Sequence, residues 1–242
     1  MRPLSTPSLL LHLFCALVCG CGTGPEPVPP PTLPAGPDGG PIAYPQVDDN
    51  VRHDTLLIQT TFDLQDGTFI MVASHIAEKF EGLRLVRYRP LPDSAADVIA
   101  VSAPGYDSWT MLPSFFRTEG MTKDHLVLAN FGEKESWGQK LMRLDDVFID
   151  LGFLDVAWPE RVVEDDTLVL KRRNIGAYTR MHVQGDTTFI TFTTDSVYLY
   201  EDLEKHFDVV LPAGQVHYTL DRSNGLQLWV NGAHGKVSMP PI

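Results

Sequence analysis

The stretch Leu56-Leu-Ile-Gln-Thr-Thr-Phe62, followed by the turn Asp66-Gly67 and the run from Phe69 to Phe80, decides the expected fold of this chain. Its first part is rich in β-branched and aromatic residues, which favour a strand. After the turn, apolar residues recur at helical spacing, namely Phe69, Val72, Ala73, Ile76 and Phe80. Gly82 ends this run, and Leu83–Tyr88 alternates like a second strand. The stretch therefore predicts a strand–helix–strand unit.

Two further copies of this order follow along the chain. One begins at His125–Asn130 and ends at Phe153–Ala157; its helical stripe consists of Leu141, Leu144, Phe148 and Leu151. The other begins at Thr188–Thr193 and ends at Asp208–Leu211; its stripe consists of Val197, Tyr200, Leu203 and Phe207. A single unit cannot bury both faces of its sheet, so the three must pack together, in one sheet or as blades around an axis. The expected fold class is α/β with repeated strand–helix–strand units.

Shorter strands fill the gaps between these copies. They are expected at Asp97–Val101 and Thr167–Lys171, and as a hairpin of Tyr218–Leu220 with Leu226–Val230 around an Asn-Gly turn.

The N-terminal residues predict export and anchoring. Residues 1–20 read as a signal peptide with a short apolar core, and Leu17-Val-Cys-Gly-Cys21 resembles a bacterial lipobox, in which Cys21 is lipidated. An ordinary signal peptide is the alternative. Residues 21–50 are rich in proline and glycine and predict a tether, and residues 51–242 are expected to form a single domain. The chain is therefore expected to be exported and lipid-anchored to the bacterial cell envelope, at the outer membrane or the periplasmic face.

Charge and cysteine content exclude several functions. The formal net charge of −12 disfavours nucleic acid as a partner and is compatible with cationic ligands. All three cysteines lie within the first 21 residues, so the remainder has no disulfide, no cysteine-ligated metal and no cysteine nucleophile. Its histidines form no pair at metal-ligand spacing, so no metal is expected.

A pocket is expected at Ala103–Phe116, where a Pro-Gly pair breaks an apolar run and Asp107 and Trp109 follow. An acid beside an indole at the end of a strand is a common way to line a ligand pocket. The structural alternative is a turn acid beside a core indole. Directly after them stand Met111 and Leu112, which supply no chemistry.

Four patches, in order along the chain, carry a family resemblance. They are Asp107-Ser-Trp109-Thr; Trp137-Gly-Gln-Lys140 with Leu144-Asp-Asp146; Gly185-Asp-Thr-Thr188 with Thr193-Thr-Asp-Ser-Val197; and Tyr200–Leu211 with Val216-His217. Together they resemble the bacterial peptidyl-arginine deiminase and agmatine deiminase group of the pentein superfamily. The resemblance implies a propeller of strand–helix units, of which this chain would cover a part. It also implies a guanidinium or cationic peptide ligand held by Asp107, Trp109 and His217, with no cofactor.

The family's chemical positions are mostly replaced in this chain. Met111 and Leu112 stand where the family has Arg-Asp, Thr219 stands where it has the acid after His217, and the nucleophilic cysteine is missing. The resemblance therefore implies a degenerate, non-catalytic binding or scaffolding domain. His217 is either a remnant of the acid/base group or a structural strand histidine. The oligomeric state is not indicated by the sequence.

A second reading of the same segments is a flavodoxin-like electron carrier. The order of elements expected in Leu56–Tyr88 and His125–Val156 also fits a doubly wound sheet that binds FMN at its strand ends. Against this reading, the loop Thr60–Thr68 lacks a compact phosphate-binding turn.

Overall fold

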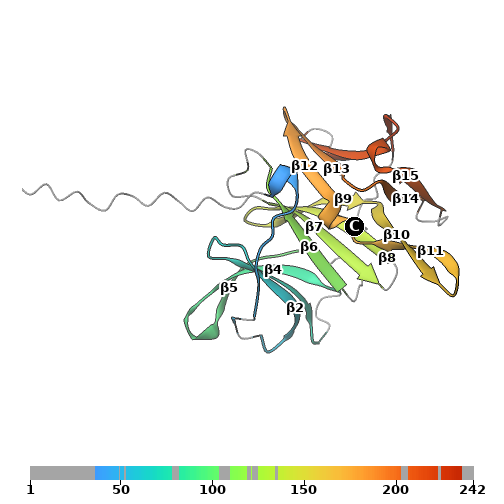
Figure 1. Ribbon diagram of the computed structural model, residues 1–242. Helices are drawn as coiled ribbons and strands as arrows, with labels where there is room; N and C mark the ends of the chain where they lie inside the picture. The colour runs from blue at the N-terminus through green and yellow to red at the C-terminus, as the bar shows by residue number, and fades with distance from the viewer. Residues whose placement is uncertain are drawn as a thin grey trace, which may run out of the picture. The chain divides into compact units, whose positions relative to one another are not determined.

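The computed structural model describes residues 36–48, 50–51, 53–77, 82–103, 110–118, 121, 125–133, 136–202, 207–222 and 225–235. All of them belong to one compact unit, Leu33–Ile242. They form β-sheets (Figure 1), and the strand pairings among these residues are antiparallel. No helix among the described residues is long and apolar enough to cross a membrane.

Two sheets are meanders, in which strands that follow each other in the chain are neighbours. The N-terminal sheet has the order β1-β2-β3-β4-β5, formed by Gln46–Val47, Leu56–Asp63, Phe69–His75, Arg84–Pro90 and Ala96–Val101. The middle sheet has the order β6-β7-β8-β9, formed by Thr110–Phe116, His125–Glu133, Ser136–Leu144 and Phe148–Leu154.

The second half of the chain forms two interleaved sheets. The C-terminal sheet has the order β12-β13-β16-β17-β18, formed by Thr179–Gln184, Thr187–Phe192, Val216–Asp221, Gly225–Val230 and Ala233–His234. The hairpin sheet has the order β11-β10-β14-β15, formed by Thr167–Arg173, Val156–Glu164, Ser196–Asp202 and Phe207–Pro212. Short 3-10 turns occur at Pro37–Gly39 (η1), Pro92–Ser94 (η2), Gly176–Tyr178 (η3) and Ala213–Gln215 (η4).

The middle sheet is buried on both faces. Val127 of β7 and Met142 of β8 pack with Ile70 of the N-terminal sheet in one apolar cluster. Leu128 and Leu141, from the same two strands, belong to a second cluster that includes residues of the C-terminal and hairpin sheets. Alternate residues of one strand thus enter two different cores, as the period-two geometry of a strand requires.

The expected α/β class is wrong, and so are both of its forms, the propeller of strand–helix units and the flavodoxin-like doubly wound sheet. All three predicted helices are replaced by strands. The Phe69–Phe80 run contains β3, the second stripe spans β8 and β9, and the third spans β14 and β15. The other predicted strands and the hairpin are confirmed, the hairpin as β16 paired with β17, but the predicted strand Phe153–Ala157 is wrong, because it covers the end of β9 and the start of β10.

The physical reason for the error is burial on both faces of a strand. In β3, Ile70 and Val72 face the cluster shared with the middle sheet, while Met71 and Ala73 face a separate cluster with Val86. A strand that buries both faces is apolar at consecutive positions, so its alternation disappears. Apolar residues then also satisfy a helical spacing by chance.

Candidate functional site

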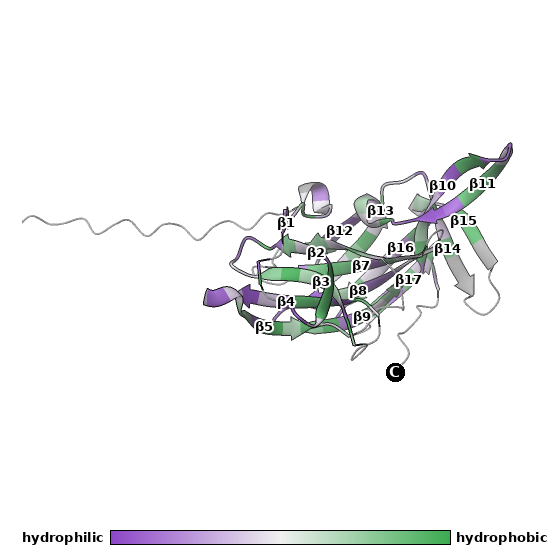
Figure 2. Ribbon diagram, turned by 90° about the horizontal axis from the view of Figure 1, so that it is seen from below, coloured by the Kyte–Doolittle hydropathy of each residue, from purple (hydrophilic) through white to green (hydrophobic). Residues whose placement is uncertain are grey.

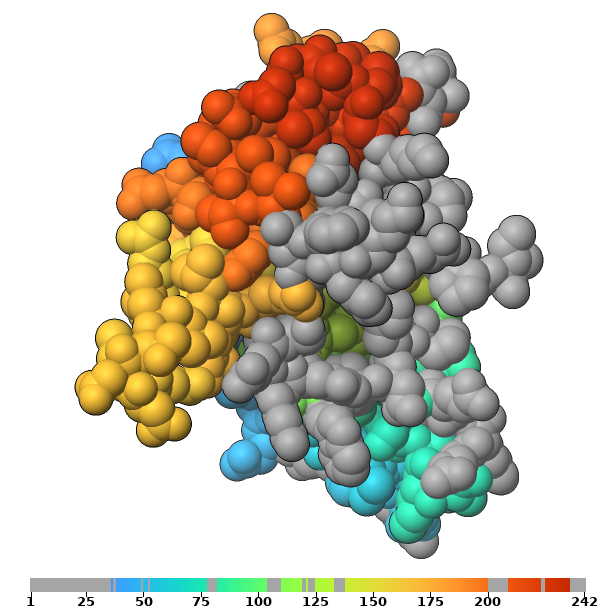
Figure 3. All heavy atoms as spheres, turned by 90° about the vertical axis from the view of Figure 1, so that its right-hand side faces the viewer, coloured from blue at the N-terminus to red at the C-terminus, as the bar shows by residue number. Residues whose placement is uncertain are grey.

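The outer face of the C-terminal sheet carries a row of aromatic side chains that we name the aromatic band. Its members, one from each strand, are His182 (β12), Phe189 (β13), His217 (β16), Trp229 (β17) and His234 (β18). The orange to red part of the surface in Figure 3 contains the strands of this sheet together with β14 and β15 of the hairpin sheet.

Strand alternation places the band on the side away from the core. The neighbours Met181, Ile190, Tyr218 and Leu228, each next to a band residue in sequence, are buried in the large apolar cluster. Since successive side chains of a strand point to opposite faces, the band residues face outward. The inward half of the sheet accounts for stability, and the outward half is available for another role.

Each ring of the band lies close to the ring on the neighbouring strand of the sheet. The centroid separations are 5.5 Å for His182–Phe189, 6.2 Å for Phe189–His217 and 6.1 Å for His217–Trp229. Trp229 and His234 are closest, at 3.9 Å. The planes of His217 and Trp229 differ by only 3°. Such cross-strand aromatic pairs stabilise a sheet modestly, by roughly 0.2–1 kcal/mol each.

The band borders an open hollow of about 610 Å³. Thr219, paired with Phe189 on one side and Gln227 on the other, forms its floor. The indole Nε1 of Trp229 donates a hydrogen bond of 2.9 Å to Thr219 Oγ1, which fixes the ring beside the hollow. The full lining consists of Thr187, Phe189, His217, Thr219, Asp221, Gln227, Trp229 and His234.

The lining contains one acidic side chain, Asp221, and neither lysine nor arginine is among the described residues that line the hollow. Asp221 also interacts with another group of the chain. Burial lowers the pKa of His217 below its usual value of 6.5, so this imidazole is neutral at pH 7. Arg180 of β12, which is not part of the lining, donates hydrogen bonds of 3.0 and 2.8 Å to the carbonyl oxygens of Ala177 and Thr179.

No known protein family, no curated protein and no solved structure matches the chain significantly. The site must therefore be judged by its own residues. The resemblance to penteins stays a prediction that no match tests.

Of the residues chosen from the sequence, one lies at this site. His217 stands between Phe189 and Trp229 in the band. Asp107, Trp109 and Cys21 lie outside the described residues. Among the described residues, no group of three or more His, Cys, Asp or Glu side chains could hold a metal ion.

The sequence reasoning missed Trp229, although a signal for it was present. The hairpin of β16 and β17 was predicted, and its turn fixes the register. In that register His217 pairs with Trp229, and Tyr218 pairs with Leu228. The alternation of side chains then places His217 and Trp229 on one face of the hairpin, and Tyr218 and Leu228 on the other. Phe189 and His182 follow only when the sheet order is known, which the sequence did not reveal.

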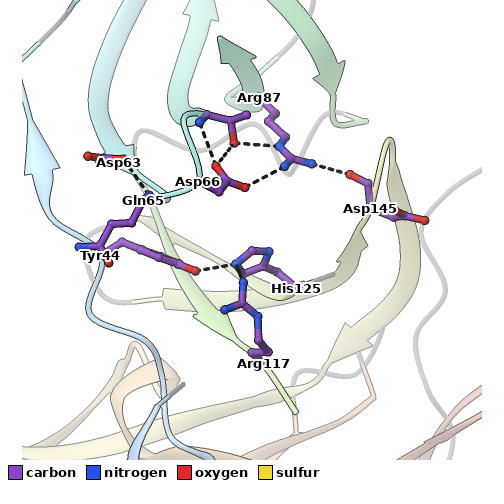
Figure 4. A network of polar contacts seen from close by, with 9 residues as sticks. Tyr44, Asp63, Gln65, Asp66, Arg87, Arg117, His125 and Asp145 are labelled. Carbon is purple, nitrogen blue, oxygen red and sulfur yellow. Dashed lines mark hydrogen bonds and ion pairs between the residues drawn. The ribbon is translucent and has the colours of Figure 1, made fainter. Parts of the chain in front are cut away.

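A second polar cluster lies between the N-terminal and middle sheets (Figure 4), and it is structural in character. Arg87 of β4 pairs with Asp66 at 3.2 Å and donates a hydrogen bond of 2.7 Å to the carbonyl oxygen of Asp145. Burial alone would raise the pKa of Asp66, but hydrogen bonds from Thr68 and the charge of Arg87 lower it below its usual value. These contacts join the β2–β3 turn to the β8–β9 turn.

The same cluster contains a buried histidine. The Nε2 atom of His125, in β7, lies 2.6 Å from the Tyr44 hydroxyl and 2.8 Å from Arg117 Nη2. Because an arginine can only donate, Nε2 is the unprotonated nitrogen of the ring. Burial, and then the charge of Arg117, lower the pKa of His125 from 6.5 to about 4. His125 is therefore neutral at pH 7.

Proposed function

We propose that this chain is an exported, lipid-anchored binding protein whose C-terminal sheet holds a cationic ligand, such as a guanidinium or ammonium group, without chemical turnover. The ligand occupies the hollow beside the aromatic band. The proposal keeps the expectation of a non-catalytic binding module. It does not use the deiminase relationship, whose α/β fold is absent from the described residues.

The observation that carries the proposal is the combination of aromatic walls with one carboxylate. An organic cation is attracted to aromatic rings within about 6 Å of its charge. A planar guanidinium can in addition donate two hydrogen bonds to a carboxylate. Phe189 and Trp229 supply the rings, and Asp221 supplies the carboxylate. The neutral His217 does not repel a cation.

The overall charge supports the same ligand class. A net charge of −12 attracts cations and repels polyanions over several ångströms. Nucleic acid bases also stack on aromatic side chains, but their phosphates favour a basic surface. A neutral sugar can also stack on the rings and donate hydroxyl hydrogen bonds to Asp221, so the dependence of binding on the positive charge of the ligand is what distinguishes a cation from a sugar.

The anchoring half of the proposal rests on Leu17–Cys21 alone. A lipid on Cys21 would hold the domain at a membrane without a membrane-spanning segment. Growth with a labelled fatty acid tests it: label is expected in the wild-type chain and is expected to be lost in Cys21→Ser. Label that persists in the variant, or its absence from the wild type, would contradict lipidation.

Calorimetry with a matched pair of peptides tests the binding half. The two peptides share one sequence and differ only in carrying arginine or citrulline at the centre, so they differ in one positive charge. The arginine peptide is expected to bind and the citrulline peptide to bind at least about tenfold more weakly, since a charge-assisted hydrogen bond contributes roughly 1.5–3 kcal/mol.

Two variants and one control assign that binding to the hollow. Trp229→Ala and Asp221→Asn are expected to weaken it. Asp195→Asn makes the same chemical change at an exposed acid outside the lining and is expected to leave binding unchanged. Equal affinity for both peptides, or an oligosaccharide that binds independently of Asp221, would refute the cation assignment.

A further inference from the structure

Two buried amide side chains lie opposite each other in the middle sheet. Asn130 of β7 pairs directly with Gln139 of β8, the neighbouring strand (Figure 2). Both residues are 0% exposed. Leu128 and Leu141, two positions away on the same strand faces, belong to the large apolar cluster shared with the C-terminal and hairpin sheets. The two amides therefore lie in apolar surroundings, where polar groups need hydrogen-bond partners.

The amide of Asn130 has hydrogen-bond partners on one side only. Its Nδ2 donates to the carbonyl oxygens of Leu112 and Leu128, at 2.6 and 3.0 Å, and lies 3.2 Å from Ser114 Oγ. Because carbonyl oxygens can only accept, these two contacts fix the orientation of the amide: exchanging Oδ1 and Nδ2 would set oxygen against oxygen. No residue that the structure describes donates a hydrogen bond to Asn130 Oδ1.

The amide of Gln139 has no partner at either of its polar atoms. Among the described residues, none forms a hydrogen bond with its Oε1 or its Nε2. Asn130 is no exception, although directly opposed residues have Cβ atoms only about 4.5–5.5 Å apart. Three polar atoms on two adjacent side chains are thus buried without a protein partner. Even a single buried atom of this kind is rare, because its desolvation costs free energy that no hydrogen bond returns.

The turn η3 packs tightly against the same place. A Cβ atom added at Gly176 would lie 2.3 Å from Ser114 Oγ and 3.0 Å from Asn130 Nδ2, so the backbone approaches more closely than any side chain would allow. This contact and the hydrogen bonds of Nδ2 hold the Asn130 amide in position. Its Oδ1 cannot reach Gln139 by rotation unless those hydrogen bonds break.

We propose that Asn130 and Gln139 bind internal water between their amide groups. Water both donates and accepts, so a single molecule can accept a hydrogen bond from Gln139 Nε2 and donate one to Asn130 Oδ1. Gln139 Oε1 is a further acceptor for its remaining hydrogen or for a second molecule. Both amides are neutral and present donors and acceptors together, whereas an ion would satisfy only one kind of group. Water is therefore the ligand that suits all three atoms.

Oxygen-17 magnetic relaxation dispersion tests the proposal, since it detects water molecules that stay inside a folded protein. Gln139→Met removes both amide atoms and nearly keeps the volume of the side chain. This variant of the full chain is expected to hold fewer long-lived waters than the wild type. Gln184→Met makes the same change at an exposed position and is expected to keep the wild-type number. An equal number in the wild type and in Gln139→Met would overturn the proposal.

Urea denaturation gives a second readout, because the sign of the change depends on the water. If Gln139 is hydrated as proposed, Gln139→Met removes hydrogen bonds and leaves Asn130 Oδ1 buried, so the urea midpoint is expected to fall below those of the wild type and of Gln184→Met. Without water, the same change removes two unsatisfied polar atoms from the core. A midpoint at or above that of the wild type would therefore count against the proposal.

A crystal structure of the wild-type chain tests the site even if the variant does not fold. Ordered water is expected about 3 Å from both Asn130 Oδ1 and Gln139 Nε2. A direct hydrogen bond between the two amides, or amides packed together with no water between them, would overturn the proposal.

Discussion

His125 makes the stability of this domain depend on pH between 6.5 and 4. The folded pKa is about 4 and the ordinary value is 6.5, so in this window the unfolded chain binds a proton that the folded chain refuses. The contribution of His125 to the free energy of unfolding is therefore fully present above pH 6.5 and decreases as the pH falls toward 4. With about 1.4 kcal/mol for each pH unit, the total loss from this one residue is about 3 kcal/mol.

The structural cause is the arrangement around His125 Nε2. A proton added there would face the guanidinium of Arg117 at 2.8 Å and displace the hydrogen bond that Arg117 donates. The side chain is 1% exposed, so water cannot solvate the new charge. Asp66 favours the proton but is outweighed by burial and by Arg117.

Urea denaturation at a series of pH values measures this effect. The wild type and His125→Gln are compared by the slope of their unfolding free energy against pH, because the variant has no group that titrates at this position. The wild type is expected to lose about 3 kcal/mol more than the variant between pH 6.5 and 4. Carboxylates contribute to both proteins alike, so they cancel in the difference. Equal slopes would refute the assignment of a neutral, proton-resistant His125.

Two further predictions concern packing and charge. Leu128→Ala, at a fully buried position of the middle sheet, is expected to cost about 2–5 kcal/mol in urea denaturation, whereas Leu57→Ala, at a 59% exposed position, is expected to change stability by less than about 0.5 kcal/mol; similar costs would contradict the assigned core. Arg87→Met is expected to raise the pKa of Asp66, measured by carbon-detected NMR, because the charge of Arg87 helps to lower it; an unchanged pKa would show that the Thr68 hydrogen bonds suffice.

Some strands, such as β2, β4 and β7, were predicted from the sequence, but β3, β8 and β14 were predicted as helices. Leu141 and Leu144 were assigned to one helical face, yet they enter different clusters, on opposite faces of the middle sheet. Their spacing of three places residues on one side of a helix and on opposite sides of a strand. Only the presence of apolar partners on both sides distinguishes these cases, and those partners, such as Ile70 and Ile190, are distant in sequence.

The sequence predicted one residue of the candidate site, His217, but for a reason other than the one that the structure shows. His217 was selected through a family resemblance, whereas its place in the structure depends on the ring of Trp229 beside it. The predicted hairpin, Tyr218–Leu220 with Leu226–Val230, contained Trp229, and His217 directly precedes its first strand. The hollow also needs Phe189 and Thr187, from a strand that pairs with β16 across the intervening β14 and β15. Such long-range pairing leaves no local signature in the chain.

The central claim is that the hollow beside the aromatic band binds a cation through Asp221 and Trp229. Its most direct test is calorimetric titration of the wild-type chain and of Asp221→Asn with the arginine peptide. The claim predicts measurable binding to the wild type that weakens at least about tenfold in the variant, while Asp195→Asn binds like the wild type. Binding of equal strength to all three proteins, or to none, would contradict it.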